Sequence, residues 1–394
     1  MSARRRLLVP LVLVFAALAA AELGVRALGA RLAWRPLPPF GRSAVQAEWL
    51  ARSERELAEA RPPPGASHFD AELGWSTRPG HVAEDGSVHV NAQGLRATRE
   101  YATTRPDGVR RVLACGESFT FGEEVADGEA WTAQLEARVP ELEVLNYGVG
   151  GYGTDQALLR VTREAQGPID ALLVGLMLEN IGRNLNRYRP LWYPSSQPAA
   201  KPRYVLGAGG LELVPQPFGT FAEFVGAVRS GAVFARLAEH EHWSDAAPPS
   251  WLAWSAAARL VAGQRAYAAR ELAPLWTDTE GVPFRTTLAL LEAFGALAQR
   301  LGSENVLVLV FPMRSDLEGF VQHGRRYWDP LLAALDARGL AHLDLAEPLA
   351  AASQESGGVR ALYRQSHLGP RGNALVAEAI AARLTQAGAP LEPK

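Results

Sequence analysis

Three uninterrupted apolar runs constrain the fold of this chain more than any other feature of its sequence. They occupy residues 112–115, 171–178 and 306–311. Strands buried on both faces read as continuous apolar runs, as in parallel sheets, whereas half-exposed strands alternate. Shorter strand patterns at 143–146 and 341–345, with amphipathic helical patterns in between, complete an alternating order. This order predicts an α/β fold with a parallel five-stranded sheet, and right-handed crossovers then place every strand's carboxyl end on one rim.

Segments of a different character precede and interrupt this pattern. Residues 29–109 read as a linker rich in Arg, Pro and Ala, followed by an N-terminal extension with a hairpin pattern near 87–90. The α/β pattern fills residues 110–186 and resumes over 283–390. Between these two parts, residues 187–282 carry a hairpin pattern at 204–214 and tryptophan-bearing helical segments. We interpret 187–282 as an insertion that caps the site.

The first 28 residues have the features of an export signal. Arg4, Arg5 and Arg6 precede residues 7–21, which carry no charge, and a basic start before an apolar run directs export. We predict an uncleaved anchor in the inner membrane, with the body in the periplasm or outside the cell. The alternative is a cleaved signal and a secreted protein, because the uncharged run is shorter than the roughly 20 residues of a spanning helix.

Composition limits the partners and cofactors of the chain. Its 40 basic and 42 acidic residues give a net charge of −2, which provides no electrostatic basis for binding nucleic acid. Cys115 is the only cysteine, so an internal disulfide and a cysteine-ligated metal site are excluded. His240 and His242 are two positions apart and therefore do not share a helix face. We expect no metal and no organic cofactor.

Polar residues gather where the predicted strands end. Ser118 follows the strand at 112–115, glycines at 148–153 follow the strand at 143–146, and Asn180 follows the strand at 171–178. His367 lies just before the final helical pattern. Ester cleavage requires a hydroxyl nucleophile, a base and donors for the developing oxyanion, and these residues can supply all three. The alternative for Ser118 is a structural one, in which its hydroxyl caps the next helix.

The same residues resemble the sequence blocks of the SGNH (GDSL-type) hydrolases. GESFTFG at 116–122 is similar to the nucleophile block G-D-S-x-T-x-G, and NYGVGG at 146–151 is similar to the second block. Asn180 stands where the third block has its asparagine, and His367, followed by LGPRGN, matches the fourth. The resemblance covers residues 111–186 and 284–387. It implies a flavodoxin-like three-layer sandwich, Ser118 as nucleophile, His367 as general base, and an oxyanion hole of Ser118 N–H, Gly151 N–H and the Asn180 amide.

One departure from the family pattern concerns the catalytic acid. The family has an aspartate shortly before the histidine, whereas the candidate positions in this chain, Arg364 and Gln365, carry no acid. Loss of the acid in a Ser-His-Asp triad costs up to roughly 10⁴ in rate. Three interpretations remain open: a Ser-His dyad whose imidazole is oriented by the Gln365 carbonyl, an acid supplied from elsewhere in the chain, or a weak or inactive enzyme.

Together these patterns predict an extracytoplasmic serine esterase. Its substrate would be a carboxylic ester with an acetyl or short acyl group, carried by a carbohydrate or a lipid, and its N-terminal helix would contact the membrane. Two alternatives remain: an O-acyltransferase acting on a cell-envelope glycan, and a non-catalytic envelope protein that has kept the fold.

Overall fold

The computed structural model describes residues 3–31, 44–60, 65–193, 196–243 and 254–386. The chain forms two compact units, which we describe separately. The first contains residues 1–61, 186–200 and 221–271, and the second contains residues 62–185, 201–220 and 272–394. The predicted insertion at 187–282 therefore contributes to both units, and its role as a cap stays a prediction.

A five-stranded parallel sheet forms the centre of the second unit, as the apolar runs predict. Its strands, in the order in which they pair, are β4 (Leu142–Asn146), β3 (Arg110–Cys115), β5 (Ala171–Met177), β8 (Val306–Phe311) and β9 (His342–Asp344). Read in chain order this is 2-1-3-4-5, the order of the flavodoxin-like doubly wound folds. Every residue of β4, β5 and β8 is buried, which explains why these strands lack alternation.

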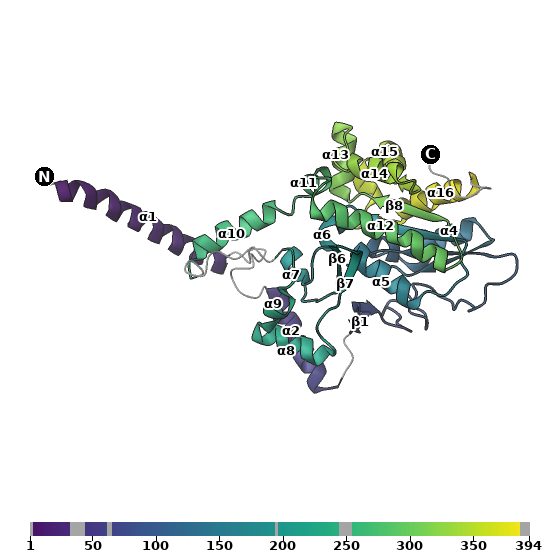
Figure 1. Ribbon diagram of the computed structural model, residues 1–394, viewed down its shortest axis with the longest axis horizontal. Helices are drawn as coiled ribbons and strands as arrows, with labels where there is room; N and C mark the ends of the chain where they lie inside the picture. The colour runs from purple at the N-terminus through teal and green to yellow at the C-terminus, as the bar shows by residue number, and fades with distance from the viewer. Residues whose placement is uncertain (1–2, 32–43, 61–64, 194–195, 244–253, 387–394) are drawn as a thin grey trace. The chain divides into compact units, whose positions relative to one another are not determined.

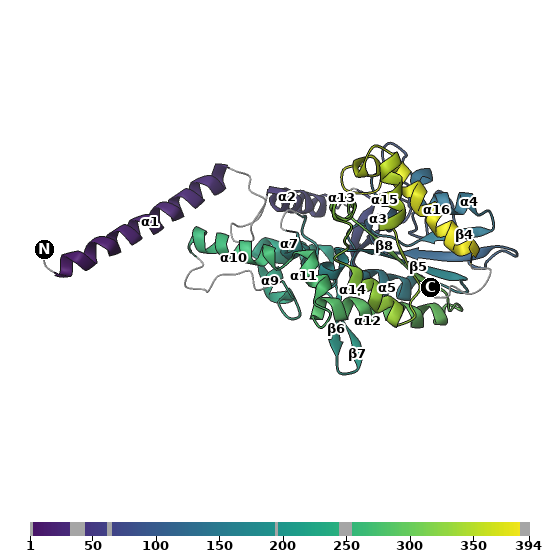
Figure 2. The same ribbon diagram turned by 90° about the horizontal axis from the view of Figure 1, so that it is seen from above.

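Helices cover both faces of the sheet (Figures 1 and 2). One layer contains α5 (Thr154–Glu164), α12 (Val282–Arg300) and α14 (Asp329–Ala337), and the other contains α4 (Trp131–Arg138), α15 (Ala346–Glu355) and α16 (Pro370–Gln386). The result is a three-layer α/β/α sandwich. Cys115 is fully buried within β3, and burial raises the pKa of its thiol, so the side chain serves as a small apolar residue of the core.

Several shorter elements of the second unit differ from the sequence prediction. The hairpin predicted near 87–90 is reduced to isolated bridges, Val82 to His89 and Val90 to Arg96, and the extension instead forms the hairpin β1 (Ser67–Asp70) and β2 (Gly74–Thr77). The predicted hairpin at 204–214 is confirmed as β6 (Arg203–Gly207) and β7 (Gly210–Val214). The remaining α-helices are α3 (Ser118–Phe121), α6 (Asn180–Arg183), α11 (Leu272–Thr277) and α13 (Arg314–His323), and 3₁₀ helices cover Asp127–Glu129 and Val359–Leu362.

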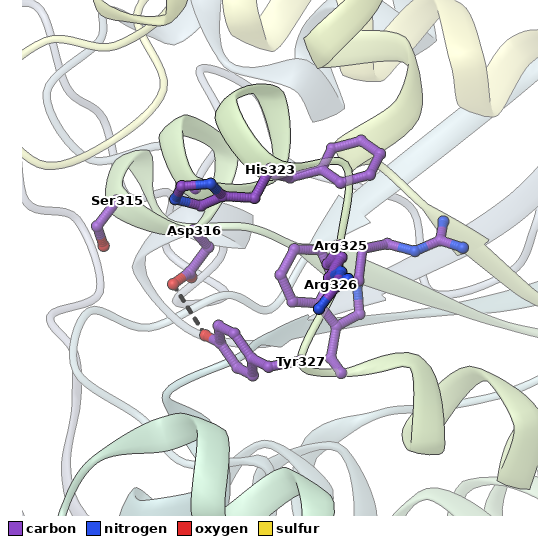
Figure 3. Close-up of a pocket in the computed structure, with 9 residues that line it drawn as sticks. Ser315, Asp316, His323, Arg325, Arg326 and Tyr327 are labelled. Atoms are coloured by element: carbon purple, nitrogen blue, oxygen red, sulfur yellow. Dashed lines mark hydrogen bonds between the residues drawn. The ribbon is translucent and has the colours of Figure 1, made fainter.

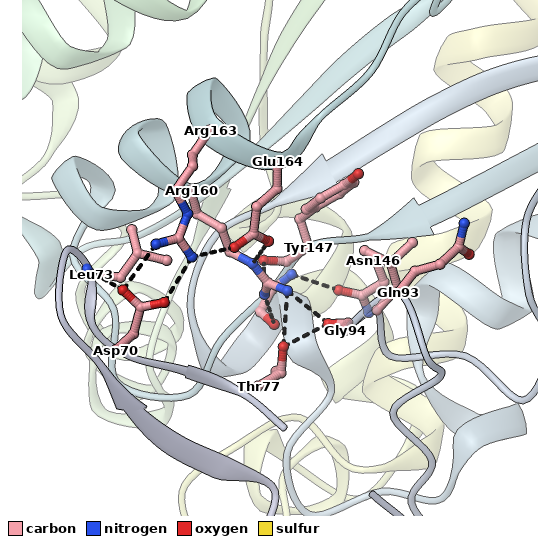
Figure 4. A network of polar contacts seen from close by, with 12 residues as sticks. Asp70, Leu73, Thr77, Gln93, Gly94, Asn146, Tyr147, Arg160, Arg163 and Glu164 are labelled. Atoms are coloured by element: carbon pink, nitrogen blue, oxygen red, sulfur yellow. Dashed lines mark hydrogen bonds and ion pairs between the residues drawn. The ribbon is translucent and has the colours of Figure 1, made fainter. Parts of the chain in front are cut away.

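A buried arginine ties the N-terminal extension to the sheet (Figure 4). Arg160 on α5 is 1% exposed and donates hydrogen bonds to the carbonyl oxygens of Gly94 and Tyr147 and to Thr77 Oγ1. It also pairs with Glu164 at 2.9 Å. Because Tyr147 begins the loop after β4, this one side chain fixes that loop and the extension together.

The first unit is helical in the part that the structure describes. Its helices are α1 (Ala3–Arg31), α2 (Ala44–Ala58), α7 (Arg189–Trp192), α8 (Phe221–Ser230), α9 (Ala232–Leu237) and α10 (Ala256–Ala268). The Glu22 carboxylate on α1 accepts hydrogen bonds from the N–H groups of Ala256 and Ala257 at the start of α10. Among the described residues, no helix combines the length and the apolar character needed to cross a membrane.

Candidate active site

Ser118 lies at the turn between β3 and α3. It is the first residue of α3, so its N–H has no acceptor within the helix. The helix cap is Glu117, whose side chain accepts a hydrogen bond from Phe119 N at 3.2 Å. The structural alternative for Ser118, that its hydroxyl caps the helix, is therefore wrong. Ser118 is only 3% exposed.

The loop after β4 packs directly against this turn. Asn146 donates to the carbonyl of Thr120 on α3 at 2.8 Å and accepts from Gly148 N–H at 2.9 Å. Gly148 has no room for a side chain, because a Cβ there would collide with the backbone of Phe121. The loop continues into Gly151, which has a φ of 79°, a conformation that glycine adopts readily.

Asn180 follows β5 and is completely buried at the start of α6. Its Nδ2 donates to Thr154 Oγ1 at 3.3 Å, while its Oδ1 has no hydrogen-bond partner within the described part of the chain. Ser118, Gly151 and Asn180 thus follow three neighbouring strands at the same rim of the sheet. Their place on one rim agrees with the sequence prediction, and their role as an oxyanion hole stays a prediction.

His367 lies in a tight loop that leads into α16. The loop is closed by a bridge between Tyr363 and Leu368, and Tyr363 Oη donates to the Pro312 carbonyl after β8 at 2.8 Å. The imidazole packs on the ring of Phe119, with centroids 5.2 Å apart. Since Phe119 directly follows Ser118, this contact places the histidine beside the turn that carries Ser118.

The carboxylate beside His367 belongs to Glu124, which the sequence reasoning missed. Glu124 Oε1 lies 2.9 Å from His367 Nδ1. The same carboxylate accepts from the backbone N–H of Gln365 at 2.9 Å, from Ser366 N–H at 3.2 Å and from Ser366 Oγ at 2.7 Å. The acid follows the serine by six residues in the chain and comes to the histidine through the fold.

The environment of Glu124 keeps it ionised. Burial by itself raises the pKa of this carboxyl, but the hydrogen bonds from His367 and Ser366 outweigh burial and lower the pKa to about 2. The backbone of Glu124 has a φ of 67°, a left-handed conformation that is uncommon for residues other than glycine. Such strain is found where surrounding contacts hold a residue in place, often at functional sites.

Gln365 has a different role in the structure from the predicted one, which was to orient the His367 imidazole. The group on Nδ1 of His367 is the carboxylate of Glu124, whereas Gln365 reaches that carboxylate through its backbone N–H. Its carbonyl oxygen accepts from Arg314 at 3.3 Å. Of the three interpretations, the geometry agrees with an acid supplied from elsewhere. A search of the sequence for acids near the nucleophile block could have suggested Glu123 and Glu124, but nothing local separates them from surface residues.

The second nitrogen of His367 also faces an acid. Nε2 lies 3.5 Å from Glu123 Oε2. No hydrogen bond joins Ser118 Oγ to this nitrogen, although both residues lie in the described part of the chain. Two consecutive glutamates therefore flank one imidazole, with Glu124 on Nδ1 and Glu123 on Nε2.

A separate pocket of about 730 Å³ lies beside α13 (Figure 3). Its lining includes Asp316 and Tyr327 but neither Ser118 nor His367. The Tyr327 hydroxyl donates to Asp316 at 2.8 Å, and burial raises the pKa of Asp316 to about 6.

Over the described residues, no group of three or more His, Cys, Asp or Glu side chains is placed to hold a metal ion.

No protein-family model matches the chain, and neither does any curated protein sequence. Among solved structures, the chain is similar to a member of the lipolytic protein G-D-S-L family from Veillonella parvula DSM 2008. The similarity has 13% identity and a TM-score of 0.33, and covers 71% of this chain and 100% of that one. A second structure is similar at 14% identity and a TM-score of 0.37, over 72% of this chain and 99% of the other.

Proposed function

We propose that this protein is a serine esterase of the SGNH type, which cleaves carboxylic esters through an acyl-serine intermediate. The observation that carries the proposal is the contact between the Glu124 carboxylate and His367 Nδ1. It supplies the acid that the sequence lacks at position 365. A serine, a histidine and an ionised carboxylate can then act in the order that nucleophilic catalysis requires.

In the proposed mechanism, Ser118 Oγ attacks the ester carbonyl and His367 Nε2 accepts the hydroxyl proton. Glu124 accepts a hydrogen bond from Nδ1–H, which holds the imidazole in the tautomer whose Nε2 is free to act as base. The same carboxylate stabilises the imidazolium. The N–H groups of Ser118 and Gly151 and the Asn180 amide would donate to the oxyanion. The ester C–O bond then breaks, the alcohol leaves with the proton from His367, and water releases the acid in a second round.

Two features of the site agree with a resting state of such an enzyme. Catalytic hydrogen bonds are often long before substrate binds and tighten in the reacting complex, so the missing contact between Ser118 and His367 is compatible with catalysis. The Asn180 Nδ2 donates to Thr154 Oγ1 at 3.3 Å. An amide NH₂ group has two N–H donors, so the second one could donate to a bound oxyanion.

A serine-directed fluorophosphonate tests the proposal directly. We expect it to label the purified protein at Ser118, and Ser118→Ala to abolish both labelling and hydrolysis of a chromogenic acetate. Ser366→Ala serves as the control variant. It removes a neighbouring hydroxyl that hydrogen-bonds the Glu124 carboxylate, but Ser366 is not the proposed nucleophile. Labelling that persists in Ser118→Ala, or a wild-type protein that resists the probe, would contradict the proposal.

The substrate and location extend the proposal beyond the site itself. We propose acetyl or short acyl esters of a carbohydrate or lipid as substrates, and export of the protein, on the basis of its basic start and the apolar run that follows. An O-acyltransferase would share the acyl-serine step and differ in its acceptor. Product analysis with and without a sugar acceptor separates the two activities, and fractionation of cells tests the location.

A further inference from the structure

Glu123 lies beside Nε2 of His367, the ring nitrogen that does not contact Glu124. Its Oε2 is 3.5 Å from His367 Nε2, and its other oxygen lies against Gly150, where an added Cβ would collide with the carboxylate. Gly150 precedes Gly151, the predicted oxyanion donor. The Glu123 carboxylate therefore lies between the base and the loop after β4. With 40% of its side chain exposed, it can contact a bound molecule.

The position of Glu123 follows from the backbone next to it. Glu123 N–H donates to the Ser118 carbonyl at 3.0 Å, which fixes the residue to the nucleophile turn. Glu124 then adopts the left-handed conformation. In an extended chain, successive side chains point to opposite faces, whereas here both carboxylates reach the same imidazole. The contacts that place Glu124 on Nδ1 thus also place Glu123 on Nε2.

The chemistry at Nε2 determines which part of the substrate meets Glu123. In the proposed esterase reaction, this nitrogen delivers the proton to the oxygen of the departing alcohol. The alcohol part of the ester must therefore lie within hydrogen-bond reach of Nε2, and so beside the Glu123 carboxylate. A negative charge there attracts a cation or hydroxyl donors and repels phosphate or carboxylate groups.

We infer that Glu123 is a specificity-determining residue that selects esters by the charge of their alcohol part. Alcohols that are cationic or neutral and rich in hydroxyl groups are accepted, whereas alcohols that carry a phosphate or a carboxylate are disfavoured. Within the proposed substrate class, this favours neutral or amino sugars over uronates and anionic lipids. The inference rests on the proposed function for the identity of the reacting ester, but its charge preference can be measured separately.

Kinetics on matched esters tests the inference. Acetylcholine and 3,3-dimethylbutyl acetate have nearly the same shape and differ by one positive charge, and acetoxyacetate carries a negative charge. We expect the ratio of kcat/KM for the cationic over the neutral ester to fall about fivefold in Glu123→Gln, the size of effect of a partly exposed charge pair. The ratio for the neutral over the anionic ester should fall as well. Because each ratio is taken within one protein, a change in overall activity cancels.

A matched control and a binding measurement complete the test. Glu141→Gln makes the same charge change at an exposed position before β4, at the amino ends of the strands and away from the rim that carries Ser118, and should leave both ratios unchanged. In full-length Ser118→Ala, binding of choline and of 3,3-dimethylbutanol can be followed through the His367 imidazole resonance. We expect tighter binding of choline, and loss of that preference when Glu123→Gln is added.

The outcomes separate this inference from the proposed function. Equal ratios in wild type and Glu123→Gln, or equal binding of the two alcohols to Ser118→Ala, would overturn the inference even in an active esterase. Preferential binding of choline that depends on Glu123, in a protein without esterase activity, would support a cation-selective site while the proposed reaction fails.

Discussion

Replacing Glu124 by glutamine should reduce esterase activity by three to four orders of magnitude. One oxygen of the carboxylate faces His367 Nδ1 and Ser366 Oγ, and the other accepts from the backbone N–H groups of Gln365 and Ser366. A glutamine must place its NH₂ group on one of these two sides. On the backbone side, the NH₂ group would face two N–H donors, so the favoured placement is against Nδ1. The imidazole must then carry its proton on Nε2, where it cannot accept one from Ser118.

The size of the effect follows from the role of the carboxylate. Loss of the acid in a Ser-His-Asp triad lowers kcat by about 10⁴ through the wrong tautomer. Glu124 makes the equivalent contact at 2.9 Å, so we expect a loss of kcat of about 10³ to 10⁴, or about 4 to 5 kcal/mol of transition-state stabilisation. The KM should change far less, because Glu124 does not contact the ester in the proposed geometry.

The assay is steady-state hydrolysis of a chromogenic acetate. Circular dichroism and urea unfolding would check that Glu124→Gln remains folded, and Glu141→Gln serves as the control for the charge change. A Glu124→Gln protein that keeps its activity within threefold, while Ser118→Ala and His367→Ala lose theirs, would refute the reasoning and favour a Ser-His dyad.

Moving the acid provides a stricter version of the same test. Glu124→Gly removes the carboxylate and places at position 124 a residue that tolerates its φ of 67°. Adding Gln365→Asp returns an acid at one of the two positions, 364 and 365, that lie shortly before His367. We expect this double variant to recover at least about tenfold in kcat over Glu124→Gly alone, whereas Gln365→Asp in the wild type should give no gain, since Nδ1 already has a carboxylate.

Two further predictions concern stability. Arg160→Met should lower the free energy of unfolding in urea by about 3 to 5 kcal/mol, because it leaves buried acceptors without a donor. Arg163→Met, at a side chain that is 30% exposed, should lower it by about 1 kcal/mol or less. Equal losses in the two variants would contradict the role given to Arg160. The pKa of Asp316 is raised from 3.8 to about 6, so its contribution to stability is complete below pH 3.8 and is lost as the pH rises through 6. Wild type should therefore lose about 2 kcal/mol relative to Asp316→Asn between pH 4 and pH 7, and parallel stability curves for the two proteins would show that Asp316 does not titrate in this way.

The sheet and most of the rim could be predicted from the sequence because their signals are local. Burial on both faces makes β5 and β8 apolar throughout, and a parallel sheet with one hand of crossover then brings the strand ends together. Ser118, Gly151 and Asn180 follow such ends directly, so their place on one rim needs no knowledge of side-chain contacts. The hairpin predicted near 87–90 forms only isolated bridges, because alternation over four residues does not show which segment will find a partner strand.

The carboxylate that contacts His367 could be identified only in the tertiary structure. Glu124 and His367 are 243 positions apart, and the contact depends on the loop after Ser118 meeting the loop before α16. It also depends on a left-handed backbone at Glu124, which a glutamate does not signal in its sequence, because neighbouring contacts rather than intrinsic preference hold it there. The sequence by itself indicated Ser118 and His367 as candidate site residues and determined the sheet at whose rim Ser118 lies. Packing between distant loops decided which carboxylate meets the histidine, since an ion pair of this kind is specified by distance in space and leaves no pattern along the chain.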